Sequence, residues 1–286
     1  MRLRYVLRFA LSLAAITGVW LATCRVSRAE EPRYRVAERL TPTPNTLPDL
    51  ITRQPNEHPL APAIRWARTG LTQIEQVQDY SATLVKRERI DGQLGEAQHM
   101  FIKVRHEPFS VYLNFLGPSS VKGQEVIFIE GRNDGQMWAH GTGYQRMLGT
   151  LSLDPNGLIA MRGNKYPITE IGLANLLRRL VAIGEREMQY GECDVRVYRG
   201  AKLNDRLCTC LEFAHPVPRK EFLYNVARIF IDDELNLPIR FESYDWPEKP
   251  GGKPQLNEEY TYLNLTINNG YTDADFDIAN SEYKFK

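Results

Sequence analysis

Apolar residues recur every three or four positions between residues 58 and 79, which is the spacing of one helical face. The residues that share this face are Leu60, Ile64, Ala67, Leu71, Ile74 and Val77. Pro59 and Pro62 suit a first helical turn, where a missing N–H leaves no hydrogen bond unmade. The pattern predicts an amphipathic helix over residues 58–79 that buries Ile64, Leu71 and Ile74.

From residue 80 the period changes to two, which is typical of strands with one buried face. Strands are predicted at residues 80–90, 93–106, 109–116, 126–130 and 136–140. Asp91-Gly92 and Asn133-Asp134-Gly135 have the residue types of tight turns between antiparallel strands. Each strand has one apolar and one mixed face, so we expect an antiparallel sheet that is covered on one side.

A second helix is predicted at residues 168–185, where an apolar stripe follows Pro167 and Gly184 lies near its end. Strands resume at residues 189–199, 207–214, 226–232, 238–246 and 257–267, and residues 273–276 are expected to form one helical turn. Strands in series, with helices set apart, predict an α+β fold. We expect a large antiparallel sheet of about nine to eleven strands with two substantial helices. Residues 58–286 suffice for one such domain.

The first 29 residues differ from the rest in charge and hydropathy. Arg2, Arg4 and Arg8 precede an apolar run over residues 9–23, and at about 15 residues this run is shorter than the roughly 20 that span a bilayer. This pattern predicts an export signal cut after Ala29, and hence a periplasmic or cell-envelope protein. Two alternatives stay open: residues 21–24 resemble a lipobox in which Cys24 is lipidated, or the run stays uncleaved as an anchor.

Two properties of the chain beyond residue 29 bear on its class. Five prolines lie between residues 30 and 57 and favour neither helix nor sheet, so this segment is expected to be an extended linker. Residues 1–29 contain five Arg and no acid, so the chain without them has 31 basic and 35 acidic residues, a net charge of −4. This balance argues against a general nucleic-acid binder, which would show a basic surplus.

Three cysteines remain in the domain, namely Cys193, Cys208 and Cys210. In an oxidising compartment one pair is expected to form a disulfide. The strands at residues 189–199 and 207–214 are predicted to pair as a hairpin, which favours Cys193–Cys208 or Cys193–Cys210. Buried free thiols are the alternative. Cys208, Cys210 and His215 have irregular spacing for a metal site, so no metal is expected.

The sequence shows no strong catalytic signature. It lacks a Gly-x-Ser-x-Gly elbow and a His-Glu-x-x-His pair, and no cofactor is expected. Acidic residues gather around the first hairpin, at Glu88, Asp91 and Glu96, and again at residues 232–234. Such acids are typical of turns, but paired carboxylates also serve glycoside hydrolysis. An envelope hydrolase of a glycan or ester is therefore the alternative to a non-catalytic protein.

The predicted strands carry more apolar surface than two helices would cover. The candidates for lining an apolar ligand cavity are Ile102, Val111, Leu113, Phe115, Ile127, Ile229, Phe241 and Leu263. A concavity of this kind would suit an acyl chain. The alternative is a plain core, in which these residues contact the helices and the protein is a non-binding scaffold.

Several stretches resemble a bacterial exported domain family of unknown function. These are YSATLVKRE at residues 80–88, KVRHEPFSVY at 103–112, GQEV at 123–126, LPIRFESYDWP at 237–247 and EYTY at 259–262. The likeness covers about residues 58–286. More distantly, the layout resembles the lipoprotein-carrier fold of the LolA and LolB type: a helix before Tyr80, a run of strands around residues 103–115, and an acidic turn before Leu237-Pro238.

The second resemblance implies a half-barrel with helices against its concave side and a hydrophobic cavity for lipid or acyl chains. On this basis we expect a cell-envelope protein that binds a lipid, a lipoprotein acyl chain or another apolar ligand without catalysis. The membrane surface is a further candidate partner. The resemblance assigns no individual binding residue, and it leaves the oligomeric state open.

Overall fold

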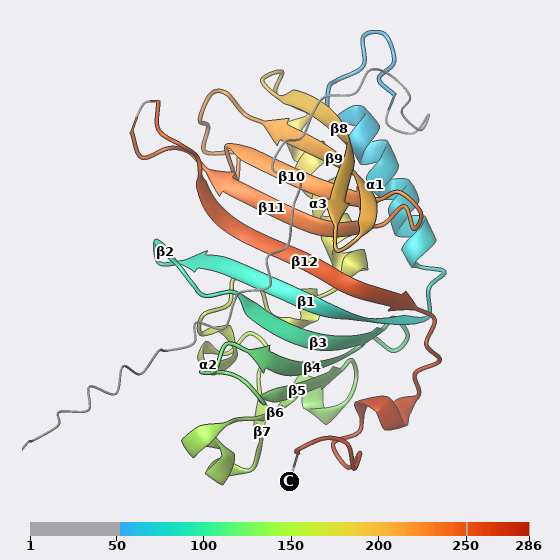
Figure 1. Ribbon diagram of the computed structural model, residues 1–286, viewed down its shortest axis with the longest axis vertical. Coiled ribbons are helices and arrows are strands. Elements are labelled where there is room, and N and C mark those ends of the chain that lie inside the picture. Colours follow the sequence, from blue (N-terminus) through green and yellow to red (C-terminus); the bar gives the residue numbers. More distant parts are fainter. Residues whose placement is uncertain (1–51, 250, 286) are drawn as a thin grey trace, which may run out of the picture. The chain divides into compact units, whose positions relative to one another are not determined.

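The computed structural model describes residues 52–249 and 251–285 (Figure 1). All described residues belong to one compact unit of the chain. The predicted export signal and nearly all of the predicted linker, residues 30–57, lie outside the described residues. No helix of the described part is long and apolar enough to span a bilayer.

A twelve-stranded antiparallel sheet dominates the described domain, and it confirms the predicted α+β class. Its strands are β1 (Asp79–Ile90), β2 (Gln93–Leu94), β3 (Gln98–Arg105), β4 (Ser110–Gly117), β5 (Glu125–Ile129), β6 (Met137–His140), β7 (Thr150–Leu153), β8 (Asp194–Leu203), β9 (Arg206–Ala214), β10 (Val226–Asp232), β11 (Pro238–Asp245) and β12 (Gln255–Ile267). The order is β7-β6-β5-β4-β3-β1-β12-β11-β10-β9-β8, with β2 paired to β1 alone. The long central strands β12, β1 and β3 curve along their length in Figure 1.

The strand count exceeds the expected nine to eleven for two reasons. The predicted strand at residues 93–106 is interrupted after Leu94 and resumes at Gln98, which makes two strands of one. The segment 150–153 also pairs with β6. The Asp91-Gly92 turn is confirmed, since Ile90 pairs with Gln93 and both turn residues have positive φ.

Two long helices, α1 (Ala61–Ile74) and α3 (Leu173–Glu187), pack on one face of the sheet and against each other. Figure 1 shows both behind strands β8 to β12, and this face is called the helix face below. The two helices approach closely at Gly184, where a side chain would not fit. A Cβ added there would lie 2.8 Å from Ile64 Cγ1. Helix α1 is shorter than the predicted 58–79. Ile64 and Ile74 are buried as expected, and Leu71 is partly buried.

The opposite, outer face is also covered in part, which corrects the expectation of a sheet covered on one side only. The C-terminal segment, residues 271–285, packs over β3 to β5 and includes the 3-10 helix η5 (Asp273–Phe276). Tyr283 stacks on Tyr112 with ring centroids 4.1 Å apart, and Lys103 Nζ lies 2.8 Å from Asp275 Oδ1. The aromatic residues of this segment therefore close a second, smaller core.

The structure also corrects the disulfide prediction, because Cys193, Cys208 and Cys210 are free and buried. In the β8–β9 register Tyr198 faces Cys210 and Asp194 faces Ala214. Cys193 therefore lies about 13 Å or more along the strand from either partner, whereas a disulfide needs Cα atoms within about 7 Å. Cys193 also belongs to the helix-face core, and the other two belong to a core on the outer face. Burial raises the pKa of the Cys193 and Cys208 thiols to about 12.

Candidate ligand-binding groove

A large groove lies on the helix face beside helix α3. The short helix α2 (Leu158–Met161) and the connecting segments at residues 141–149 and 154–166 form its other wall. Its volume is about 1570 Å³. Pockets for drug-sized ligands have roughly 300–1,000 Å³, so this groove has room for a longer molecule.

The floor of the groove is apolar and comes from alternate residues of neighbouring strands. It consists of Leu84 of β1, Met100 of β3, Leu113 and Phe115 of β4, Val126 of β5, and Met137 and Ala139 of β6. The register explains this grouping: Met100 pairs with Phe115, and Val126 pairs with both Leu113 and Ala139. Paired residues of adjacent strands point to the same face, so these side chains form one continuous surface.

The predicted cavity residues fall into different places. Leu113, Phe115 and Phe241 line the groove. Ile102, Val111 and Ile229 belong to the core under the helices, and Ile229 lines a separate small cavity there. Leu263 requires a correction: it is buried on β12 and pairs with Thr83, but it follows the groove residue Tyr262, so it points to the opposite face and does not line the groove.

Ile127 requires a correction, because it lies on the outer face. It pairs with Tyr112 and packs in the small core closed by the C-terminal segment. The strand period of two explains the difference, since the residue before it, Val126, points into the groove. The alternation along β5 was visible in the sequence, but both of its faces are apolar, so the sequence could not tell which one faces the groove.

One end of the groove carries a cluster of charged and hydroxyl side chains that the sequence analysis did not assemble. Glu88 and Glu258 are paired residues of β1 and β12, and both are buried. The Tyr260 hydroxyl donates to Glu88 Oε1 and lies 3.4 Å from Glu258 Oε2. Tyr166 donates to Glu258 Oε2 at 2.9 Å. The two carboxylates therefore lie side by side and share a tyrosine hydroxyl.

Two lysines complete this polar cluster. Lys86 Nζ lies 3.3 Å from Glu88 Oε2, and Lys165 Nζ lies 3.6 Å from Glu258 Oε2. Burial lowers the pKa of Lys86, and the Glu88 charge opposes that effect. Burial raises the pKa of Tyr260, so its hydroxyl stays protonated and serves as a donor. The cluster balances its own charges and can hydrogen-bond a polar group at the end of an apolar groove.

A metal site is not part of this arrangement. Among residues 52–249 and 251–285, no group of three or more His, Cys, Asp or Glu side chains is placed to hold a metal ion. Glu88 was singled out from the sequence only as part of an acidic hairpin, and Glu258 was not singled out at all. The two are 170 positions apart, so only the pairing of β1 with β12 brings them together.

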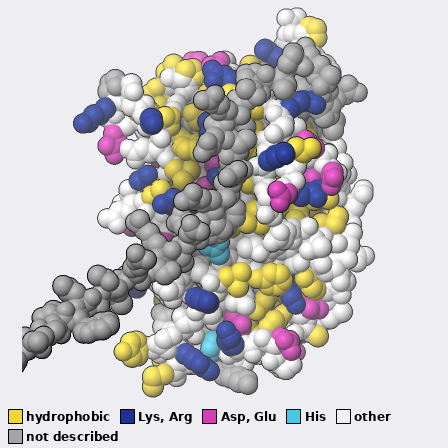
Figure 2. All heavy atoms as spheres, viewed as in Figure 1, with side chains coloured by type: hydrophobic (Ala, Val, Ile, Leu, Met, Phe, Trp, Pro, Cys, Tyr) yellow, Lys and Arg dark blue, Asp and Glu magenta, His cyan; other side chains and the backbone are white. Residues whose placement is uncertain are grey.

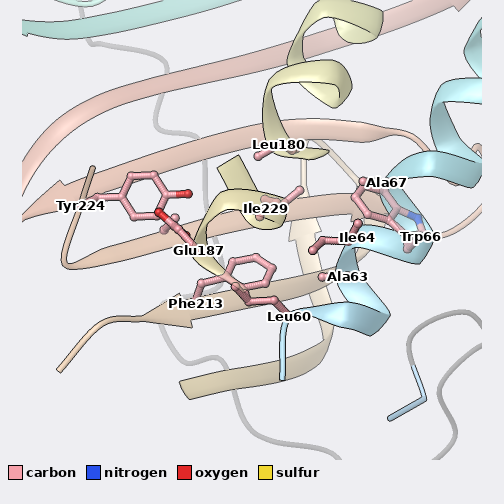
Figure 3. Close-up of a pocket in the computed structure, with 12 residues that line it drawn as sticks. Leu60, Ala63, Ile64, Trp66, Ala67, Leu180, Glu187, Phe213, Tyr224 and Ile229 are labelled. Carbon is pink, nitrogen blue, oxygen red and sulfur yellow. The ribbon is translucent and has the colours of Figure 1, made fainter. Parts of the chain in front are cut away.

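A second, small cavity of about 30 Å³ lies where α1 and α3 meet the sheet (Figure 3). Its walls are apolar except for Glu187, which lies beside Tyr224 at one end, with Trp66 and Ile64 toward the other. His215 Nδ1 is 3.1 Å from the Tyr224 carbonyl oxygen, which only accepts, so Nδ1 carries the proton. The unprotonated Nε2 then faces Glu187 Oε2 at 3.4 Å. Burial raises the pKa of Glu187 to about 7, and neither Glu187 Oε1 nor His215 Nε2 has a hydrogen-bond partner among the described residues.

Because the pKa of the buried Glu187 is raised, the free energy of unfolding is expected to depend on pH, and the direction of the pKa shift gives the sign. The pKa of Glu187 is about 7 in the folded protein and about 4.5 when unfolded, so folding takes up a proton between these values. Its stabilising contribution is complete below about pH 4.5 and is lost as the pH rises through about 7. Burial lowers the pKa of His215, so protonation of this residue at lower pH favours the unfolded protein. Its effect on stability therefore has the opposite sign to that of Glu187.

We expect Glu187→Gln to remove this dependence while keeping the size of the side chain. When the pH rises from about 5 to about 8, the free energy of unfolding of wild type should fall relative to that of the variant, by up to about 3 kcal/mol. Urea unfolding at both pH values measures the shift. A difference between the two proteins that does not change with pH would contradict the assignment of the proton to Glu187.

Comparisons with known proteins extend the description. Residues 77–285 match the family described as "Protein of unknown function (DUF1571)", and no curated protein matches the sequence. Among solved structures, the chain is similar to a DUF1329 family protein from Desulfovibrio piger, at 15% identity, with 77% of this chain and 98% of that chain covered and a TM-score of 0.37. It is also similar to the lipoprotein LppX of Mycobacterium tuberculosis, at 11% identity, 75% and 97% coverage and a TM-score of 0.42.

A third similar structure is a LolA superfamily protein from Nitrosomonas europaea, at 11% identity, with 74% of this chain and 97% of that chain covered and a TM-score of 0.30. The family match spans the central strands β1, β3 and β12 and every element of the groove. It extends from β1 to the C-terminal segment. It confirms the resemblance to a domain family of unknown function that the sequence motifs indicated. The chain belongs to the DUF1571 family.

Proposed function

We propose that this protein binds a lipid, a lipoprotein acyl chain or another apolar ligand in the groove, in the periplasm or cell envelope, and does not transform it. The observation that carries the proposal is the continuous apolar floor beneath a volume of about 1570 Å³. Burying apolar surface is worth roughly 25 cal/mol per Å², so a chain laid along this floor gains affinity with its length. The export signal predicted at residues 1–29 supports the location.

The polar cluster at Glu88 and Glu258 adds a preference for a ligand that has both an apolar chain and a polar head. Its lysines and tyrosine hydroxyls lie where the apolar floor ends, so they suit the polar head of an amphiphile whose chain covers the floor. Because the cluster neutralises itself, a neutral head that donates and accepts hydrogen bonds fits it better than a strongly charged one.

Hydrolysis of a glycan or ester is the second candidate, and the paired carboxylates favour it. Glycosidases use two carboxyl groups that flank the bond to be cleaved. Here both carboxylates lie on one wall, and each is already held by a lysine and a tyrosine hydroxyl. This arrangement supports binding over catalysis. If wild type hydrolysed a glycan or ester substrate and Glu258→Gln did not, the hydrolase would be favoured over the binding protein.

Filling the floor tests the proposal directly. Ala139 lies on β6, the outermost strand of the floor, and is only partly buried, so Ala139→Trp should project an indole into the groove with little effect on the core. We expect the affinity for a fluorescent fatty acid to fall about tenfold or more, since each tenfold corresponds to only about 1.4 kcal/mol of lost packing. Leu113→Gln would be less informative, because Leu113 belongs to both the groove and the buried core.

Ala274→Trp is the matched control, because Ala274 is exposed in η5 at the outer face. It should bind the fatty acid like wild type, and both variants should keep the wild-type melting temperature within a few degrees. Wild-type protein that takes up no fatty acid, and that carries no lipid detectable by mass spectrometry after purification, would refute the proposal and leave the scaffold alternative.

A further inference from the structure

The mouth of the groove exposes large apolar side chains, which folded proteins usually bury. Two segments provide them: the 3-10 helix η3 (Gly143–Leu148) and helix α2. We call Tyr144, Met147, Leu148, Leu158 and Ile159 the rim patch. Tyr144 and Leu158 are each 93% exposed, more than any other large apolar residue in the described part of the chain. Single exposed apolar residues are ordinary, but five on two segments that line the same groove require an explanation.

The rim patch belongs to the groove and has its own charge. Four of its residues, all except Met147, also line the groove, so the patch borders the groove. Arg146 and Arg162 are exposed within and just after these segments, and Lys122 is exposed on the groove wall. Residues 141–162 contain two basic residues, Arg146 and Arg162, and a single acid, Asp154. In Figure 2, hydrophobic side chains protrude beside Lys and Arg side chains at the lower left, the end where Figure 1 places β6 and β7.

We propose that the rim patch docks the mouth of the groove onto the surface of an anionic lipid bilayer. Apolar tips flanked by Arg and Lys are the composition of segments that lie in a bilayer interface, with the apolar side chains below the headgroups and the cations at the phosphates. A tyrosine at the tip suits the same boundary, since its ring is apolar and its hydroxyl is polar. Charge complementarity therefore selects the anionic bilayer over an uncharged protein surface.

Docking in this orientation connects with the proposed function. The opening of the groove would face the acyl region, so a chain could pass between bilayer and groove without crossing water. This connection rests on the proposed function, whereas the docking itself depends only on the rim patch and its basic neighbours. The two can therefore be tested separately.

The test measures co-flotation with vesicles of phosphatidylethanolamine and phosphatidylglycerol. It uses residues 34–286, which form a compact unit of their own, so that the apolar segment at residues 9–23 does not contribute. Met147→Glu places a charge at the most exposed tip that does not line the groove. We expect it to lower vesicle binding about tenfold or more. Arg146→Gln combined with Arg162→Gln should lower binding about tenfold on these vesicles and leave the weaker binding to phosphatidylcholine vesicles unchanged.

Leu207→Glu is the matched control, because Leu207 is an exposed apolar residue on β9, outside the rim segments. It should float with the vesicles like wild type. Wild type that does not float, or Met147→Glu that floats equally well, would overturn the proposal. A dimer that Met147→Glu dissociates, without vesicle binding by wild type, would overturn it in favour of a second copy of the chain.

Uptake of the fluorescent fatty acid by wild type, measured without vesicles, separates this proposal from the previous one. Vesicle binding without uptake would remove the proposed ligand and keep the docking surface. Uptake without vesicle binding would do the reverse.

Discussion

Replacing Arg240 with Met is expected to lower the free energy of unfolding by about 3–5 kcal/mol, the usual cost of removing one partner from a buried ion pair. Arg240 lies on the outer face of β11 and is only 8% exposed. Its Nη2 is 2.7 Å from Glu242 Oε2 and 2.6 Å from Glu259 Oε2. Without the guanidinium, two poorly solvated carboxylates would face each other across neighbouring strands.

The ion-pair network continues through Arg228, which bridges Glu242 and Glu212, and its far end supplies a control for this substitution. Arg196 lies at the network's edge on β8, 3.6 Å from Glu212 Oε1, and its side chain is largely exposed. Solvent screens such a pair, so Arg196→Met should cost at most about 1 kcal/mol. Urea unfolding of both variants measures the difference. Equal and small losses of unfolding free energy in the two variants would show that Glu242 and Glu259, the carboxylates paired with Arg240, are well solvated.

Ile74→Ala is the second substitution with a large expected effect. Ile74 ends helix α1, is fully buried, and packs in the core between the helices and the sheet. Truncating a buried Ile to Ala costs about 2–5 kcal/mol, because the apolar contacts are lost and the space left behind collapses only partly. The melting temperature and the denaturant midpoint should both fall clearly.

The choice of control for Ile74 depends on the tertiary structure. Gln73 looks like a neutral exposed neighbour in the sequence, but its Oε1 accepts a hydrogen bond from Asn236 Nδ2 at 3.0 Å. Asn236 Oδ1 in turn accepts from Trp66 Nε1 at 2.9 Å, so Gln73→Ala would disturb a network. Thr72 is exposed on the same helix, and Thr72→Ala should change stability by less than about 0.5 kcal/mol. Comparable losses for Ile74→Ala and Thr72→Ala would show that α1 does not pack on this side.

Local sequence patterns determined the elements and their class. The alternation along residues 80–90 and the turn at Asp91-Gly92 depend on neighbouring residues, so β1 and its reversal could be predicted directly. The apolar stripe that predicted a helix over residues 168–185 is likewise local; α3 forms over most of that range, at Leu173–Glu187, and Ile168–Glu170 form a separate 3-10 turn. Strands in series with separate helices then predicted the α+β fold without any knowledge of which strands pair.

The assembly of the groove depended on long-range pairing, which local patterns do not encode. Glu88 meets Glu258 only because β1 pairs with β12, and Cys193 misses Cys210 because the β8–β9 register places it opposite the end of β9. Ile127 lies outside the groove and Val126 inside it, because both faces of β5 are buried and a shift of one residue exchanges them. The sequence alone determined that this protein has a large antiparallel sheet with apolar faces. The tertiary structure decided which of those faces packs under helices, which is closed by the C-terminal segment, and which is left to line a groove, since that choice depends on contacts between segments far apart in the chain.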